Sequence, residues 1–271
     1  MAAGSRSPEF VPVRLGGMAL RNGIMVHSLD HWAAAVRADD GDIRMASGRK
    51  PELPDQALRV PGMRGLMRVA EALYLLPIVR SRLPEARLPF EAPGAIAAML
   101  GAAVTGRIVA KKLPPVSAEL VSAGISLAPA LAALRGSQLA RYHGAEHKAI
   151  GGYEHGEEAV DIAKEHERCG SHLVGPMLAA TVAGNVLVAR LRLKPEHRGP
   201  ARLAVSLGAI GIATETFSWM QRNRTNPLAR ALARPGSSLQ KLAATEEPGA
   251  DELEVARAAL NEVLRLEGAA A

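Results

Sequence analysis

One stretch of the sequence concentrates side chains that can bind a metal ion and move a proton. His143 and His147 are four residues apart, and on an α-helix this spacing puts both imidazoles on one face, within reach of one metal ion. With Glu146 between them they match the H-x-x-E-H pattern of the inverted zinc peptidases. In those enzymes the histidines hold zinc and the glutamate takes a proton from a zinc-bound water. The pattern predicts a zinc site with Glu146 as the general base of a hydrolytic step.

Two more potential ligands follow along the chain. His166 and Cys169 have the H-x-x-C spacing that can place an imidazole and a thiolate on one metal ion. With His143 and His147 they would complete a tetrahedral zinc set. The alternative for Cys169 is a buried thiol that packs as a small hydrophobic side chain. Because Cys169 is the single cysteine, no internal disulfide can form and no oxidising compartment is implied.

Glu215 is the one acidic residue in an otherwise apolar segment, residues 203–220. A carboxylate in such a segment is costly and usually has a partner. The H-x-x-E-H peptidases take a third ligand from a glutamate far downstream, so by analogy Glu215 is a candidate metal ligand. The other interpretation is an ion pair with Arg107, which needs no metal.

Other chemistries find little support. The sequence has no G-x-x-x-x-G-K-[ST] loop, no G-x-G-x-x-G after a strand and no G-x-S-x-G elbow. The net charge is +6, but only 3% of the residues are aromatic, so stacking on single-stranded nucleic acid is not expected. Short basic clusters flank apolar segments, which suits an anionic membrane surface better. The remaining histidines are predicted to be surface or structural: His27, His31, His155, His172 and His197.

The elements that must position these residues are mainly helical. Four apolar segments, rich in small residues, cover residues 93–110, 118–134, 172–189 and 203–220. Each lies near the lower limit of about 17–25 residues for a spanning helix, and small residues are typical of helix interfaces in membranes. Short basic loops, 107–117 and 190–202, join the segments in pairs. We predict a mainly α, polytopic membrane protein of about four spans; the alternative is a soluble helical bundle.

The rest of the chain divides around these spans. Residues 1–60 are predicted to be a small cytosolic β element of two short strands, and 61–90 an amphipathic helix in the membrane interface. Residues 91–221 would hold the membrane helices, with the motif segment 135–171 inserted between them. Residues 222–271 would be a cytosolic tail ending in an amphipathic helix over 250–266, with Asp251 as its N-cap. Because the ends carry no export signal, we expect them and the motif segment in the cytosol of a bacterial cell.

The residues carrying the motif resemble a known family. Tyr142 to Lys148 reads YHGAEHK, Arg168 to Gly170 reads RCG, and Gly16-Gly17 through Met25 is similar to a family element near the N-terminus. These strings resemble the YqhQ-like bacterial membrane proteins, a family of unknown function. The resemblance implies membrane location, several spans and a cytoplasmic motif region, but no activity. The chain departs from the family pattern at four positions: Met18, Asn22, Glu167 and Ser171.

Two functions are compatible with this sequence. The first is a metal-binding membrane protein, with zinc at the histidine cluster and, if it is an enzyme, metal-dependent hydrolysis. The second is a membrane scaffold whose cluster is structural and whose basic tails contact a protein partner at the cytosolic face. An open coordination position beside Glu146 favours chemistry, and a closed site of four protein ligands favours structure. The sequence predicts neither substrate nor oligomeric state.

Overall fold

The computed structural model describes residues 12–91, 94–191 and 193–269. The N-terminal part is a four-stranded antiparallel sheet in which each strand pairs with the next along the chain. The strands are β1 (Gly16–Leu20), β2 (Gly23–His27), β3 (His31–Arg37) and β4 (Ile43–Arg49). The turn before β4 contains Gly41, whose positive φ of 92° few other residues adopt easily.

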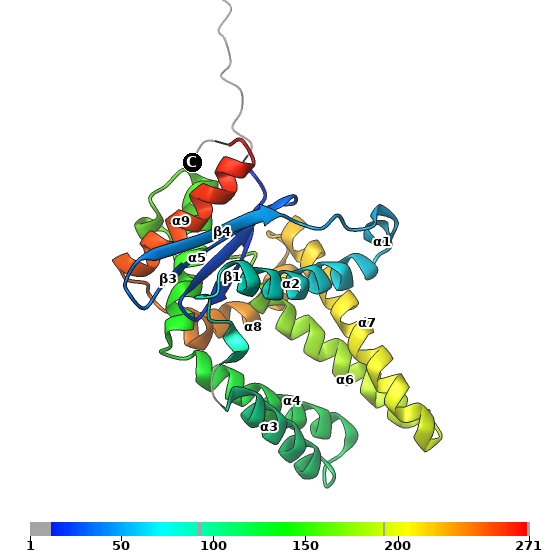
Figure 1. Cartoon of the computed structure of the whole chain (residues 1–271). Helices are drawn as coiled ribbons and strands as arrows, with labels where there is room; N and C mark the ends of the chain where they lie inside the picture. Colours follow the sequence, from blue (N-terminus) through cyan, green and yellow to red (C-terminus); the bar gives the residue numbers. More distant parts are fainter. Residues whose placement is uncertain (1–11, 92–93, 192, 270–271) are drawn as a thin grey trace, which may run out of the picture.

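Helices cover both faces of this sheet (Figure 1). The covering helices are α2 (Met63–Arg82), α5 (Gln138–His155) and α9 (Ala250–Leu266). On β3, Ala33 and Ala35 pack against α5 and α9, while Trp32 and Ala34 face α2. A strand buried on both sides is a continuous apolar run with no alternation. For this reason the sequence pattern predicts a β element here but only two of its four strands.

Helix α9 occupies the residues expected for the C-terminal helix. Its apolar face, which includes Val255, Ala259 and Val263, is fully buried against the sheet and α5. The helix start differs from the expectation. The N-cap is Gly249, whose N–H donates to the Glu252 carboxylate at 2.8 Å, so Asp251 lies within the first turn, where its charge favours the helix dipole.

Two helical hairpins extend from the same side of the sheet body (Figure 1). The first is α3 (Ala95–Ala110) with α4 (Pro115–Leu134), and the second is α6 (Val174–Arg190) with α7 (Pro195–Arg222). Residues 115–134, 170–190 and 195–222 are long and apolar enough to cross a membrane, and residues 96–110 form a shorter apolar helix. The four apolar segments of the sequence are therefore the four hairpin helices, and three of them have spanning length.

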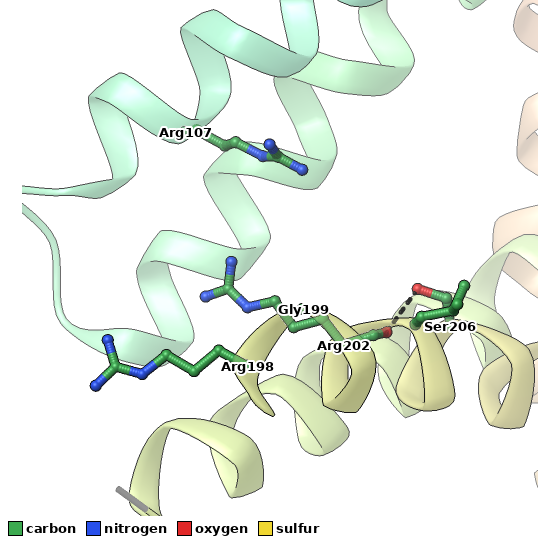
Figure 2. A pocket seen from close by; sticks show the side chains of 6 residues that line it. Arg107, Arg198, Gly199, Arg202 and Ser206 are labelled. Atoms are coloured by element: carbon green, nitrogen blue, oxygen red, sulfur yellow. Dashed lines mark hydrogen bonds between the residues drawn. The ribbon is translucent and has the colours of Figure 1, made fainter. Parts of the chain in front are cut away.

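The hairpins expose apolar surface that a soluble protein would bury. On α3, Ile96, Leu100, Val104 and Ile108 follow at four-residue intervals and are each 56–64% exposed, and none of the described α4 residues is buried. Contiguous apolar surface of this kind marks contact with a membrane or a partner. The helices are compatible with a lipid bilayer and with membrane location. Their free ends carry arginines (Figure 2).

Short elements complete the described chain. They are α1 (Asp55–Arg59), α8 (Pro227–Leu239), three 3-10 turns over Pro89–Glu91, Ala159–Asp161 and Gly170–Leu173, and a π turn over Gln240–Ala244.

Candidate metal centre

Helix α5 presents the motif from the centre of the sheet body. The Ser137 side chain caps its N-terminus, and Gly156, with a φ of 68°, ends it. Gly144 packs directly on the backbone carbonyl of Glu246, where a Cβ would not fit, which holds the helix close to the segment before α9. One face of α5, including Tyr142 and Ala145, joins the core. The adjoining face carries His143, Glu146 and His147 toward a small cavity.

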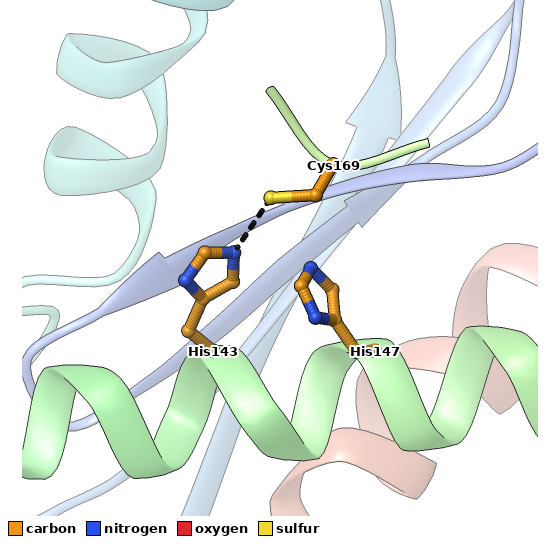
Figure 3. A group of neighbouring side chains, drawn as sticks. All are labelled: His143, His147 and Cys169. Carbon is orange, nitrogen blue, oxygen red and sulfur yellow. Dashed lines mark hydrogen bonds between the residues drawn. The ribbon is translucent and has the colours of Figure 1, made fainter. Parts of the chain in front are cut away.

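Three potential ligands meet at this face of α5. One ligand atom each from His143, His147 and Cys169 lies within 4.8 Å of the other two. The Cys169 Sγ is 3.4 Å from His143 Nε2, and the two imidazole centroids are 4.4 Å apart. Figure 3 shows both rings projecting from α5 toward the thiol, which comes from the segment before α6. The structure thus brings together two ligands predicted from the helical spacing and one from much further along the chain.

Backbone carbonyls orient both imidazoles of this group. Nδ1 of His143 lies 2.8 Å from the carbonyl oxygen of Ala244, and Nδ1 of His147 lies 2.6 Å from that of Lys164. A carbonyl oxygen only accepts, so Nδ1 carries the proton in both rings and Nε2 keeps its lone pair. Histidines that ligate a metal through one nitrogen are held in the same way through the other. The two rings therefore have the tautomer that metal binding through Nε2 requires.

Burial sets the protonation of the group. It lowers the pKa of His147 to about 3, with the neighbouring His143 adding to the effect, so this imidazole is neutral at physiological pH. Burial raises the pKa of Glu146 to about 7, where a carboxyl group can both accept and give a proton. Burial also raises the pKa of the Cys169 thiol. A bound cation would favour the thiolate, which is the form that ligates metals.

Glu146 reaches the cavity beside the three ligands. The cavity has a volume of about 160 Å³, enough for a few water molecules. Across it lies Gly17 of β1, and a Cβ at that position would stand 2.6 Å from Glu146 Cγ. A glycine in the strand thus makes room for the carboxylate. The sequence alone does not reveal this role, because a glycine in a short strand has no distinctive pattern.

His27, which the sequence predicts to be a surface or structural histidine, is another residue that lines the cavity. It lines the cavity from the end of β2, opposite Gly16 in the sheet register. Its Nδ1 lies 3.3 Å from the Lys50 ammonium, which is itself buried and 3.0 Å from the Glu71 carboxylate. Burial and the Lys50 charge lower the pKa of His27. Because His27 lies far from the motif in sequence, only knowledge of the β1–β2 pairing would have shown that it reaches the cavity.

His166 lies beside the three-residue group rather than within it. Its ring centroid is 5.5 Å from that of His147, and its Nε2 is 3.4 Å from Glu154 Oε2. Its backbone N–H donates to the Gln240 side chain at 2.8 Å. The structure therefore favours three protein ligands over the set of four, with His166 in a surrounding layer.

The structure does not bring Glu215 to this group. Its carboxylate accepts from both Nε and Nη2 of Arg64, with the Nε contact at 2.7 Å, and from the Gly62 N–H at 2.9 Å. The reason is that the start of α2 packs against the middle of α7 and supplies an arginine there. In the structure Glu215 forms an ion pair, as the second interpretation expects, but its partner is Arg64 and not Arg107.

Comparison with known proteins assigns the chain to a family. The family described as "Protein of unknown function (DUF1385)" matches residues 122–266, a range that runs from α4 to α9 and includes all three ligands. The chain belongs to this family. It is also 26% identical over 311 aligned residues to a Bacillus subtilis (strain 168) protein described as "Uncharacterized protein YqhQ", covering 96% of this chain and 95% of that protein. The resemblance to YqhQ-like proteins is confirmed. No solved structure matches the chain.

Proposed function

We propose that this protein spans the bacterial cell membrane several times and binds zinc through His143, His147 and Cys169. One observation carries the metal site: three nitrogen and sulfur donors converge within 4.8 Å, and both imidazoles are hydrogen-bonded through Nδ1 to backbone carbonyls. Imidazole and thiolate are the donors that zinc prefers in proteins. The donor set is compact and already oriented.

The activity that this centre supports best is metal-dependent hydrolysis. Catalytic zinc sites have three protein ligands and one open position, whereas structural sites have four. Here the three converging donors border a cavity that Glu146 also lines, while His27 and His166 line the same cavity outside the three-donor group. When bound, zinc supplies a Lewis acid that polarises a substrate carbonyl. Glu146, with its pKa near 7, would accept the proton of the attacking water and pass it to the leaving group.

A structural role for the cluster is the second candidate. Cys169 immediately precedes the turn Gly170–Leu173, which leads into α6, so the group ties helix α5 to the start of a candidate span. In this case the protein would be a membrane scaffold with a docking surface on its cytosolic side. The two candidates share the metal site and differ in whether replacing Glu146 abolishes a reaction.

The membrane placement follows from the two hairpins. In this arrangement the sheet body, the metal centre and residues 222–271 lie in the cytosol, and α3, α4, α6 and α7 enter the bilayer. Helix α2 would lie in the interface, because it leaves Leu73 and Tyr74 exposed next to its arginines.

Metal content of the full chain tests the proposal. The protein is purified from membranes in detergent without chelators and analysed by elemental mass spectrometry. We expect about one zinc per chain, lost in Cys169→Ser and in His147→Ala. His155→Ala is the matched control, because His155 is exposed at the end of the same helix and its loss should leave the zinc in place. Folded wild-type protein that contains no zinc, or an equal loss of zinc in His155→Ala, would contradict the zinc site.

A further inference from the structure

A second cavity lies at the opposite end of the molecule, between the free ends of the two hairpins. It has a volume of about 580 Å³, within the range of roughly 300–1,000 Å³ that is usual for small-ligand sites. Three arginines line it: Arg107 in the last turn of α3, and Arg198 and Arg202 near the start of α7. Figure 2 shows the Arg107 and Arg202 guanidinium groups extending into the same space from opposite hairpins.

Among the described residues, none that lines this cavity carries a carboxylate. Within the described ranges, none of the three guanidinium groups has an ion-pair partner, and the Nε of Arg198 donates to the Leu193 carbonyl at 3.0 Å. The nearby Glu119 of α4 instead accepts a hydrogen bond from Asn185 of α6 at 2.8 Å. Three uncompensated positive charges around one space attract an anion. The planar fork of arginine matches phosphate oxygens in particular.

Apolar side chains adjoin the arginines. Leu203 lines the cavity and is 61% exposed, and Ile108, one residue from Arg107, is 59% exposed. A soluble phosphate compound would leave this apolar surface in water. A phospholipid would cover it, because its charged phosphate lies directly next to hydrocarbon. We propose that this cavity binds the phosphate group of an anionic phospholipid, whose acyl chains lie along the exposed apolar faces of α3 and α7. The lipid would bridge two hairpins whose main contact in the described chain is between α4 and α6.

This site rests on the proposed membrane location, but it is independent of the metal centre. The hairpin ends lie far from the sheet body (Figure 1), so in the proposed membrane location the cavity would lie at the membrane surface opposite that body. Long basic side chains near the ends of spanning helices reach the membrane surface, where guanidinium groups can pair with lipid phosphates.

The test compares two variants with the same loss of charge. In the site variant Arg107, Arg198 and Arg202 are all replaced by Gln. In the control variant Lys111, Lys112 and Lys194, which are close in sequence but do not line the cavity, are replaced by Gln. Each full-length protein is reconstituted into nanodiscs of mixed phosphatidylglycerol and phosphatidylcholine. Retained lipids are then counted by native mass spectrometry after release.

We expect the wild-type and control proteins to retain phosphatidylglycerol in preference to phosphatidylcholine. In the site variant, the ratio of retained phosphatidylglycerol to phosphatidylcholine should fall by about tenfold or more. An Arg-to-Lys triple variant, which keeps the charge without the fork, should fall between them. Equal preference in the site variant, or equal loss in the control, would overturn the lipid site.

A second arm distinguishes lipid from free phosphate. The melting temperature in detergent is measured with inorganic phosphate or with a short-chain phosphatidylglycerol at equal concentration. Stabilisation by the lipid alone, absent in the site variant, supports the proposal, and equal stabilisation by inorganic phosphate contradicts it. If the wild-type chain does not enter nanodiscs at all, the membrane location itself fails, which is a different result from loss of lipid preference in incorporated protein.

Discussion

The environment of Glu146 opposes the charge of its carboxyl group. It is buried in the sheet body and no described basic side chain pairs with it; burial raises the pKa of its carboxyl group from 4.5 to about 7. In the unfolded chain the same group ionises near its ordinary value. The neutral form is therefore favoured in the folded state, so the metal-free protein loses stability as the pH rises from about 4.5 through 7.

Replacing Glu146 by Gln should remove this pH dependence. Metal-free wild-type protein should be less stable at pH 8 than at pH 5, by up to roughly 3 kcal/mol from this group alone, and Glu146→Gln should flatten the difference. The measurement is the melting temperature of chelator-treated protein across this pH range. Glu157→Gln is the control, because Glu157 is exposed. An unchanged pH profile in Glu146→Gln would show that the carboxyl group is not neutralised by burial.

Some site residues can be recognised from sequence spacing alone, and others depend on how distant segments pack. His143 and His147 follow from helical spacing, because the geometry of one helix fixes their separation. Cys169 and His166 are both candidates by spacing, but only the fold of the segment after α5 decides between them. It turns the Cys169 thiol toward His143 and leaves His166 near Glu154. The ion pair of Glu215 depends on α2 packing against α7, which no local pattern encodes.

At the scale of elements, the contact between β1 and α5 builds the cavity. Gly17 lies against the Glu146 side chain, and any Cβ there would overlap it. The four hairpin helices were predictable because each is a long apolar run, and the C-terminal helix because its apolar residues recur at helical spacing. The number of strands was not, because β3 is covered on both faces by helices far away in sequence. Consequently the sequence could not show that a strand forms one wall of the site.

Gly17→Ala tests this contact. The added methyl group should displace the Glu146 side chain and destabilise the protein by about 1–3 kcal/mol, as overpacking of a filled interior does. Gly101→Ala on α3 is the matched control, since a Cβ there meets no atom within 4 Å, and it should leave stability unchanged or slightly raised. The readout is the melting temperature of the detergent-purified proteins. A Gly17→Ala protein as stable as the wild type would mean that β1 does not confine Glu146.

The whole molecule consists of two different parts. The sheet with its covering helices is rich in titratable groups, and the two hairpins are apolar. The body holds both core clusters of the described chain, whereas the hairpins pack mainly within themselves. If the hairpins lie in lipid, their free ends and the sheet body must be on opposite sides of the membrane.

Cysteine labelling tests this topology. In a Cys169→Ser background, Lys112→Cys places a thiol at the free end of the first hairpin, and Glu52→Cys places one after the sheet; both positions are exposed. A membrane-impermeant maleimide should label Lys112→Cys in intact cells, but Glu52→Cys only after lysis. The reverse pattern would put the sheet body outside the cytosol, and labelling of both in intact cells would contradict a spanning arrangement.

X-ray absorption at the zinc edge of the full-length protein, purified from membranes, tests the central claim most directly. We expect one sulfur ligand at about 2.3 Å together with two imidazoles. The sulfur signal should vanish in Cys169→Ser, while His155→Ala should give the wild-type spectrum. A zinc shell of nitrogen and oxygen alone in the wild-type protein, or the same spectrum in Cys169→Ser, would contradict a metal centre built from His143, His147 and Cys169.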